Sequence, residues 1–546
     1  MKIALAQLNY HIGNFEYNTE KIIAHIKQAK EQGADLVVFA ELAVCGYPPR
    51  DFLEFDEFIQ LCEESAAEIA RHCQGIACIL GIPVRNDLVA GKDLYNAAYF
   101  IEEAKVKAVV KKALLPNYDV FDEYRYFESG QQFDCIEFKG VKIALTICED
   151  LWNINDNPLY IANPMDVLIG QKPDLMINIA ASPFSYAHDD ERMVVLGDNA
   201  KKYQLPLLYV NQVGAQTEIV FDGGSLAFDA EGNLLDEMPY FEEALRMYDF
   251  EDAVIQGYIP KKHQPTSDIE QIYSALVLGI KDYFAKSGFS KAVLGLSGGI
   301  DSAVVCALAC RALGPENVMA VLMPSKYSSD HSIKDALDLV DNFGCMHEII
   351  AIKDAADAFD GMMANAFKDL PQNLTEENIQ ARCRGIVVMA MSNKFGYILL
   401  NTSNKSECAV GYGTLYGDMC GAIGVIGDVY KTQVYDLAHY INKDGIVIPE
   451  NSIIKPPSAE LRPGQKDSDS LPDYDTLDKV LYQYIELKQS SSSIISQGYD
   501  EGLVRRIIKM VNGAEFKRYQ TPPILRVSPK AFGMGRRMPI VGKYLS

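Results

Sequence analysis

Short apolar runs that alternate with helix-like segments constrain the fold of this chain most strongly. IALAQL (3–8), DLMINIAA (174–181) and KAVLGL (291–296) are examples, all rich in Val, Ile and Leu. Runs of this length without regular polar alternation are typical of strands buried on both faces. Between such runs, EYNTEKIIAHIKQAKEQG (16–33) has apolar residues at helical spacing and ends at Gly33. The pattern predicts layered α/β structure.

The length of the chain predicts more than one domain, because 546 residues exceed what a single ordinary core can organise. A polar, proline-containing stretch, YIPKKHQPTSD (258–268), interrupts the strand and helix pattern. We therefore expect a first domain at 1–255, a linker at 256–270 and a second domain at 271–546. In the second domain, KAVLGL, the helix after it and NVMAVLMP (317–324) form a βαβ unit. Such a unit predicts a right-handed crossover in a doubly wound parallel sheet.

Charge and cysteine usage limit the partners and the compartment that we expect. Lys and Arg number 51 against 74 Asp and Glu, so the net charge is −23. A chain this acidic repels nucleic-acid backbones and anionic membrane surfaces, and we expect neither as a partner. The 12 cysteines are scattered without a CxxC pair, which argues against a disulfide framework and against structural zinc. With a start unlike a signal peptide and no apolar run long enough to span a bilayer, we expect a cytoplasmic protein.

The strongest local motif is GLSGGIDS (295–302), between a predicted strand and a predicted helix. Glycines let backbone N–H groups approach a phosphate, and the helix N-terminus adds favourable partial charge. A Walker loop would continue with Lys and Ser or Thr, but Asp301 and Ser302 stand here instead. A carboxylate next to phosphates requires a divalent cation between them, so Asp301 is a candidate Mg²⁺ ligand. The candidate ATP-binding residues of this loop are Gly295, Leu296, Ser297, Gly298, Gly299, Ile300, Asp301 and Ser302.

This loop resembles that of the ATP pyrophosphatase superfamily, which adenylates a carboxylate or amide oxygen and releases pyrophosphate. ENIQARCRG (377–385), NTSNKSE (401–407), GYGTLYGDMCGAIGVIGDVYKT (411–432) and KPPSAEL (455–461) extend the resemblance to the NAD⁺ synthetases. The resemblance implies an adenine nucleotide alpha hydrolase-like domain that uses ATP and Mg²⁺. It implies further ATP-site residues at Thr402, Lys431 and Ser458, a second Mg²⁺ ligand at Glu407, and deamido-NAD-binding residues at Asn378, Arg382, Glu407 and Lys517.

Three motifs in the first half predict an amidase site. FAELAVCGYPP (39–49) contains Glu41, VVKKALLPNYDVFDEYRYF (109–127) contains Lys112, and ALTICEDLW (144–152) contains Cys148. Two of these residues follow predicted strands, where α/β proteins present side chains to substrate. A thiol nucleophile needs a base and gains from a neighbouring cation, which Glu41 and Lys112 can supply. Lys112 can also stabilise the oxyanion of a tetrahedral intermediate.

The three motifs resemble those of the nitrilase, or carbon–nitrogen hydrolase, superfamily, whose triad is Glu-Lys-Cys. The resemblance implies an α-β-β-α sandwich over roughly 1–250, with Glu123 as a supporting acid. It also implies glutamine-binding residues at Tyr118 and Ser182. The basic residue expected six positions after Ser182 is His188, so His188 and Arg192 are both candidates for the glutamine carboxylate.

Together the halves resemble the glutamine-dependent NAD⁺ synthetase family. The resemblance implies a ligase in which a Glu-Lys-Cys site releases ammonia from L-glutamine. The other half adenylates deamido-NAD⁺ with ATP and amidates it to NAD⁺, forming AMP, diphosphate and glutamate. It also implies a homo-oligomer. Two alternatives remain open at this point: another amidase-coupled adenylating ligase, and a non-catalytic nucleotide sensor.

Overall fold

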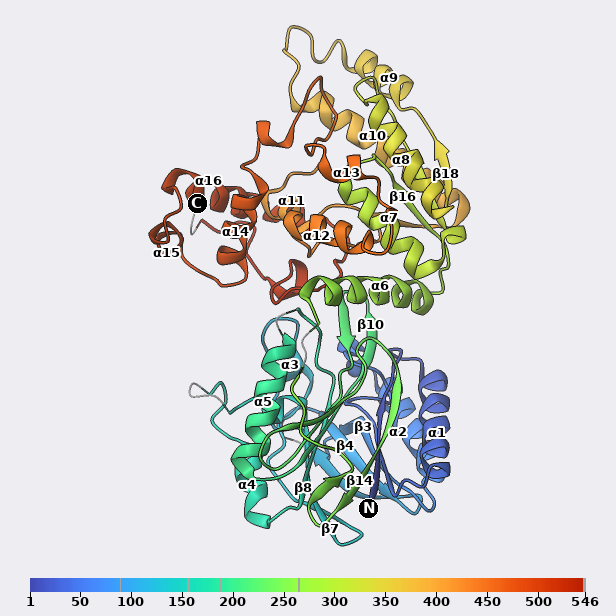
Figure 1. Cartoon of the computed structure of the whole chain (residues 1–546), viewed down its shortest axis with the longest axis vertical. Coiled ribbons are helices and arrows are strands. Elements are labelled where there is room, and N and C mark those ends of the chain that lie inside the picture. Colours follow the sequence, from blue (N-terminus) through green and yellow to red (C-terminus); the bar gives the residue numbers. More distant parts are fainter. Residues whose placement is uncertain (89, 155–157, 187, 264–265, 544–546) are drawn as a thin grey trace. The chain divides into compact units, whose positions relative to one another are not determined.

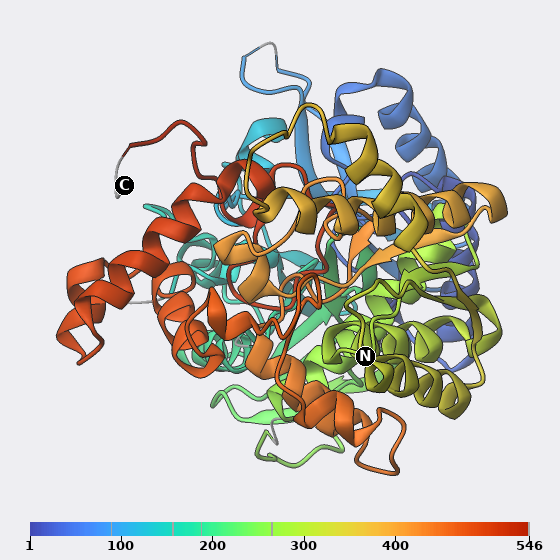
Figure 2. The same cartoon turned by 90° about the horizontal axis from the view of Figure 1, so that it is seen from above.

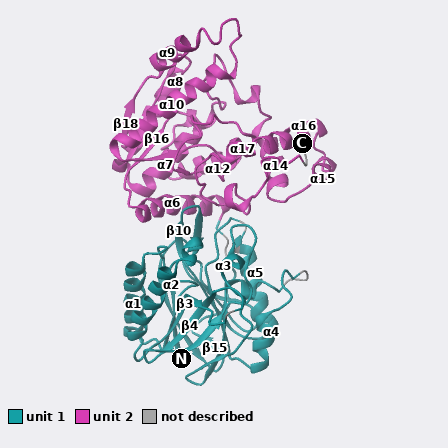
Figure 3. Ribbon diagram, turned by 180° about the vertical axis from the view of Figure 1, so that it is seen from behind, with its two compact units in different colours: residues 1–266 teal, residues 267–546 magenta. Residues whose placement is uncertain are grey.

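The computed structural model describes residues 1–546 except 89, 155–157, 187, 264–265 and 544–546. The chain divides into two compact units, Met1–Thr266 and Ser267–Ser546, which are coloured separately in Figure 3. None of the helices among the described residues is both long and apolar enough to cross a membrane.

Unit 1 contains two large sheets flanked by helices (Figure 1). One sheet has the strand order β15-β14-β1-β2-β3-β4-β5, the other has the order β13-β12-β9-β8-β7-β6, and β10 and β11 form a separate pair. The strands are β1 (Lys2–Gln7), β2 (Leu36–Val38), β3 (Ala77–Arg85), β4 (Leu94–Glu102), β5 (Lys105–Lys111), β6 (Ile136–Phe138), β7 (Val141–Ile147), β8 (Leu175–Ala180), β9 (Leu207–Asn211), β10 (Val213–Gln216), β11 (Ile219–Asp222), β12 (Leu226–Phe228), β13 (Leu234–Glu237), β14 (Ala244–Glu251) and β15 (Val254–Gln256). The helices are α1 (Phe15–Glu31), α2 (Asp56–Arg71), α3 (Glu123–Tyr126), α4 (Pro164–Leu168) and α5 (His188–Tyr203), with the short 3₁₀ helices η1 (Arg50–Glu54), η2 (Cys148–Leu151) and η3 (Ile169–Gln171).

Side-chain alternation along β1 explains the layers of unit 1. Ile3 and Leu5 point into a core shared with residues of the second sheet, such as Leu145. Ala4 and Ala6 point the other way, into a core shared with residues of α1 and α2. Successive side chains of a strand face opposite sides, so a strand buried on both faces must be apolar throughout. With α4 and α5 beyond the second sheet (Figures 1 and 3), the predicted α-β-β-α sandwich is confirmed.

Unit 2 is built on a parallel sheet with the strand order β18-β17-β16-β19-β20. Val388 of α10 packs against Val293, Val321 and Leu399 of the sheet, and α7 lies on the other side of β16 (Figures 1 and 3). The predicted doubly wound parallel sheet is therefore confirmed. The strands are β16 (Ala292–Gly295), β17 (Val318–Leu322), β18 (Met346–Ile349), β19 (Ile398–Asn401) and β20 (Ile423–Gly424). The helices are α6 (Asp268–Ser287), α7 (Ile300–Leu313), α8 (Asp330–Phe343), α9 (Lys353–Met363), α10 (Leu374–Phe395), α11 (Lys405–Val410), α12 (Lys431–Ile441), α13 (Glu450–Ile454), α14 (Tyr474–Ile485), α15 (Ser491–Ser496), α16 (Glu501–Gly513) and α17 (Glu515–Arg518), with η4 (Pro315–Asn317), η5 (Asp467–Asp469) and η6 (Gly533–Gly535).

The segment between the units differs in detail from the predicted linker at 256–270. β15 ends at Gln256 and α6 begins at Asp268. The first residues of α6 therefore lie within the predicted linker. Residues 264–265 of that linker lie outside the described residues. Helices α11, α14 and α16 enclose a separate apolar core that includes Leu477, Val504 and Ile507. Figure 2 shows these C-terminal helices, in orange and red, from a second direction.

Candidate active sites

In unit 1, Glu41 lies just beyond β2 because the neighbouring strand allows a close backbone approach. A Cβ atom at Gly81 of β3 would lie 2.4 Å from the Ala40 carbonyl oxygen and 2.4 Å from the Leu42 amide nitrogen. Only glycine leaves room for that turn. The Glu41 side chain is 1% exposed, and its Oε2 accepts a hydrogen bond from the Ala181 amide at 3.0 Å.

Lys112 joins two carboxylates into one buried cluster. Its Nζ donates to Glu41 Oε1 at 2.6 Å and to Glu123 Oε1 at 2.8 Å, and none of its side chain is exposed. Asn96 of β4 donates to both acids, at 2.6 and 3.2 Å, and the Tyr47 hydroxyl donates to Glu123 at 2.9 Å. Burial alone would lower the pKa of Lys112, but the two carboxylates raise it well above its ordinary value. The lysine is therefore held as a cation.

Cys148 begins η2 at the end of β7 and has a left-handed backbone, with φ of 44°. This conformation is uncommon outside glycine and is often found at functional positions. Asp150 ties the turn to the segment after Lys112 by accepting hydrogen bonds from the Ala113, Leu114 and Ile147 amides at 3.0, 2.9 and 3.0 Å. Burial and the charge of Glu41 raise the pKa of the Cys148 thiol well above its ordinary value, and Lys112 opposes that shift. The sulfur therefore rests as a protonated thiol, and the charges of both Glu41 and Lys112 act on it.

Glu149, the residue after Cys148, is an acid that the sequence interpretation did not single out. Its carboxylate accepts hydrogen bonds from the Tyr118 hydroxyl, at 3.0 Å to each oxygen, and from the Tyr160 hydroxyl at 3.0 Å. Burial raises the pKa of Glu149 to about 7, against the effects of Lys112 and the two tyrosines. Tyr118, a predicted glutamine-binding residue, is thereby hydrogen-bonded to the residue that follows Cys148.

The remaining predicted glutamine-binding residues differ in their availability to a ligand. Ser182 Oγ lies 3.1 Å from His188 Nε2, and the His188 ring stacks on Trp152 with 4.8 Å between ring centroids. Arg192 is fully buried and donates to both oxygens of Asp222, at 3.0 and 2.7 Å. Because its guanidinium is engaged by that carboxylate, His188 is better placed than Arg192 to meet a carboxylate near Ser182.

In unit 2, the predicted phosphate loop lies between β16 and α7 as expected. Gly298 has a φ of 78°, and a Cβ there would lie 2.1 Å from the Ser332 carbonyl oxygen, so the turn requires glycine. Ser297 Oγ lies 3.1 Å from Ser302 Oγ and accepts from the Gly299 amide at 3.2 Å. The loop thus presents backbone amides at the start of α7, an arrangement suited to phosphate.

Asp301, Glu407 and Lys431 come together beside this loop from three distant segments. Asp301 accepts a hydrogen bond from Lys431 Nζ through one oxygen and from Asn404 Nδ2, at 2.9 Å, through the other. Glu407 and Asn404 form a reciprocal cap at the start of α11. Burial and then the charge of Asp301 raise the pKa of Glu407 well above its ordinary value, while Lys431 opposes the shift. Two carboxylates that repel each other next to a phosphate loop fit a Mg²⁺ ion, which binds through one or two carboxylates and substrate phosphates.

The other predicted residues of unit 2 lie on surrounding elements. On α10, Asn378 accepts from the Thr414 hydroxyl at 2.7 Å and Arg382 donates to the Leu415 carbonyl at 3.2 Å. Lys517 donates to the Gly411 and Gly413 carbonyls, each at 2.8 Å. The first two therefore contact the 414–415 turn, and the last contacts the 411–413 segment before it. Thr402 follows β19, and the exposed Ser458 donates to the Gln465 carbonyl at 2.6 Å within its own loop.

Sequence reasoning missed several polar residues that complete these clusters. Asn96 lies within a strand, and Asn404 lies between motif residues that were recognised. Neither position has a spacing in the sequence that marks it as a site residue. Glu149 is adjacent to Cys148, but only its burial and its tyrosine partners distinguish it from an ordinary acid. The adjacency was the one signal in the sequence that could have identified it.

Each half of the chain matches a family of known proteins. Residues 2–259 match the family model described as carbon–nitrogen hydrolase, and residues 272–521 match the one described as NAD synthase. A glutamine-dependent NAD(+) synthetase of Synechocystis sp. is 46% identical, with 98% of each chain covered. One of Acinetobacter baylyi is 41% identical, over 99% of this chain and 98% of that one.

A solved structure aligns with this chain over the whole length. The glutamine-dependent NAD⁺ synthetase of Acinetobacter baumannii, in complex with ADP, has 38% sequence identity and a TM-score of 0.79, with 100% of this chain and 99% of that chain covered. The identities and the two matched families lead to one conclusion: the chain belongs to the glutamine-dependent NAD(+) synthetase family of ligases.

Proposed function

We propose that this enzyme converts deamido-NAD⁺ to NAD⁺ with ATP, using ammonia that its own amidase site releases from L-glutamine. The products are NAD⁺, AMP, diphosphate and glutamate. The observation that carries the proposal is the presence of two buried charged clusters, one in each unit, around Cys148 and beside the phosphate loop. Each cluster belongs to a part of the chain that matches the corresponding family.

In the amidase step, Cys148 attacks the side-chain amide carbon of glutamine. Its resting thiol is protonated, so a base must remove the proton as the sulfur attacks. Glu41 serves as that base, and Lys112 stabilises the negative oxygen of the tetrahedral intermediate. Glu41 passes that proton to the departing nitrogen, ammonia leaves, and a thioester remains. Water activated by the carboxylate of Glu41 then releases glutamate. The hydrogen bonds from Lys112, Asn96 and the Ala181 amide support this role, because they hold the carboxylate of Glu41 in one orientation.

Glutamine is recognised through groups near the thiol. Glu149 suits the α-ammonium group, since it is a buried carboxylate directly after the nucleophile and is oriented by Tyr118 and Tyr160. His188 and Ser182 meet the α-carboxylate, with Arg192 behind them in its ion pair with Asp222.

In the synthetase step, the loop Gly295–Ser302 holds the ATP phosphates, and the nicotinate carboxylate is adenylated before ammonia displaces AMP. Asp301 and Glu407 would hold Mg²⁺, which neutralises charge that develops on the phosphates. Lys431 adds a second positive charge next to Asp301. Thr402 and Ser458 complete the ATP site, and Asn378, Arg382 and Lys517 bind deamido-NAD⁺. The enzyme works as a homo-oligomer.

The test is Cys148→Ala, assayed with glutamine and separately with an ammonium salt as the nitrogen source. We expect glutamine-dependent NAD⁺ formation to fall by at least about 10⁴-fold, as for loss of a nucleophile. Ammonium-dependent formation should stay within about twofold of wild type. Equal loss with both donors would contradict the division of labour. Failure of wild type to release diphosphate with deamido-NAD⁺ would instead favour the nucleotide sensor.

A further inference from the structure

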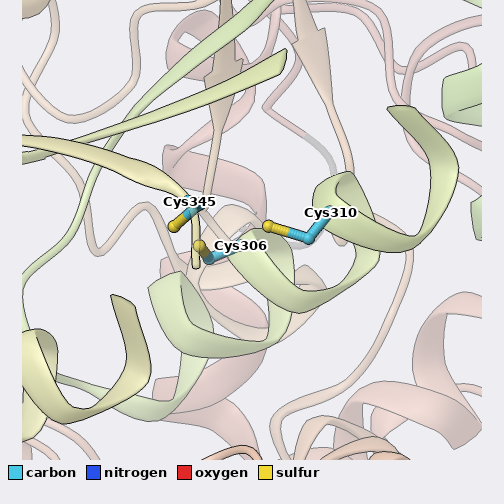
Figure 4. A group of neighbouring side chains, drawn as sticks. All are labelled: Cys306, Cys310 and Cys345. Atoms are coloured by element: carbon cyan, nitrogen blue, oxygen red, sulfur yellow. The ribbon is translucent and has the colours of Figure 1, made fainter. Parts of the chain in front are cut away.

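Three cysteines of unit 2 meet in space although the sequence separates them. Cys306 and Cys310 lie one turn apart on α7, and Cys345 comes directly before β18. Their sulfur atoms all lie within 4.8 Å of one another, and Figure 4 shows them turned toward one another from the helix and the neighbouring segment. This is the only set of three potential metal ligands found within that distance in the described part of the chain.

The geometry and burial of the three thiols suit a metal ion. The residues are 0%, 5% and 6% exposed, so water competes little for the sulfur atoms. A tetrahedral Zn²⁺ with Zn–S bonds of about 2.3 Å separates its sulfur ligands by about 3.8 Å, which lies inside the observed limit.

The electrostatic surroundings also suit a cation. Cys310 lies in the last turn of α7, where the helix dipole favours positive charge. Glu316 adds negative charge near Cys310. A bound cation would be stabilised by both the dipole of α7 and the charge of Glu316.

We propose that Cys306, Cys310 and Cys345 bind a Zn²⁺ ion. Binding breaks three S–H bonds, forms three Zn–S bonds and passes three protons to solvent. Thiolates select soft or borderline ions over Mg²⁺ and Ca²⁺. Three thiolates with Zn²⁺ leave one net negative charge in the protein interior, whereas Cu⁺ would leave two, so burial favours zinc.

Zinc bound by three thiolates has a fourth position for a further ligand. His347 of β18 lies two residues after Cys345 and is exposed. Zinc would then connect α7, which carries Asp301 at its start, to the segment that precedes β18.

Zinc titration of the full-length, reduced protein against a chromophoric zinc chelator tests the site. We expect wild type to bind about one equivalent, with an affinity that falls at least about 100-fold in Cys306→Ser, Cys310→Ser and Cys345→Ser. Cys135→Ser, which removes a half-buried thiol from unit 1, should bind as wild type does. Cobalt(II) should give thiolate charge-transfer absorption in wild type and in Cys135→Ser, and lose it in the other three variants.

Folding and oxidation are controlled in the same experiment. Thermal unfolding of each variant followed by circular dichroism reports that unit 2, which carries the three thiols, is folded. Uptake below about 0.1 equivalent by wild type, or wild-type affinity in Cys345→Ser, would overturn the proposal. So would recovery of a disulfide between any two of the three cysteines, in place of zinc, from protein purified without reductant.

Discussion

The two charged clusters contain the same number of acids and bases but are balanced differently. In unit 1, Lys112 donates to both carboxylates, and after burial its charge is the largest influence on Glu123. In unit 2, Lys431 donates to Asp301 alone, and the largest charge effect on Glu407 is repulsion from Asp301. The first cluster is therefore more nearly balanced by its own lysine, whereas the second, as proposed, would be completed by a cation and substrate phosphates.

Removal of the single lysine from each cluster tests this difference most strongly. Lys112→Met leaves two buried carboxylates without a cation, and we expect a loss of about 3–5 kcal/mol in the free energy of unfolding. Lys431→Met should lose less, and millimolar Mg²⁺ should restore part of its melting temperature. Thermal unfolding with and without Mg²⁺ measures both. Equal rescue of the two variants by Mg²⁺ would show that the clusters do not differ in this way.

The close backbone approach at Gly81 gives the next largest effect. Gly81→Ala places a methyl group 2.4 Å from the Ala40 carbonyl oxygen, so the turn that carries Glu41 must move. We expect a loss of about 1–3 kcal/mol in stability and at least about a tenfold drop in glutaminase kcat. Gly170→Ala is the matched control, since no atom lies within 4 Å of its added Cβ and, like Gly81, it is not among the glycines with positive φ. A glutaminase rate in Gly81→Ala equal to that of the control would contradict a positioning effect on Glu41.

The proposed role of Glu149 predicts how glutamine binding depends on pH. Because burial raises its pKa to about 7, the carboxylate loses charge as the pH falls below neutral, and its attraction for the α-ammonium group weakens. We expect the glutaminase KM for glutamine to rise about tenfold between about pH 8 and about pH 6. Tyr118→Phe removes a hydrogen bond that lowers this pKa, so the rise should begin at higher pH. Glu149→Gln should have a KM that is high and nearly independent of pH; an unchanged profile would exclude this role.

Substitution of Glu407 gives a still smaller expected change in the free energy of unfolding. Its raised pKa means that the folded state holds its proton more tightly than the unfolded chain does. The stability that this provides is present in acid and lost as the pH rises through the folded-state pKa. Glu407→Gln should therefore raise the free energy of unfolding by about 1 kcal/mol at neutral pH without Mg²⁺, while ammonium-dependent synthesis falls.

The matched change in unit 1 should have a smaller effect on stability. Burial also raises the pKa of Glu123, but the charge of Lys112 is the largest charge effect on this carboxyl and opposes that shift. Glu123→Gln also weakens the interaction with Lys112, so we expect a change in the free energy of unfolding smaller than that of Glu407→Gln. Chemical denaturation of both variants in chelator measures the two changes, and changes of equal size would remove the distinction between the clusters.

Much of the fold was predictable because its signals are local. Apolar runs, helical spacing and the glycines of Gly295–Ser302 depend on neighbours along the chain, and they predicted both layered units. The linker predicted at 256–270 overlaps the start of α6 at Asp268, because the segment before the helix is polar and contains proline. The motifs predicted Glu41, Lys112, Cys148 and Asp301 as site residues.

The sequence by itself determined the order of strands and helices, the phosphate loop and the family to which the chain belongs. Only the tertiary structure decided which groups share a buried environment. It pairs Arg192 with Asp222, places two tyrosines on Glu149, and gathers three cysteines whose spacing had argued against zinc. The physical reason is that burial and Coulomb interactions depend on distance in space, as between Glu41 and the Ala181 amide, which are 140 residues apart in the chain.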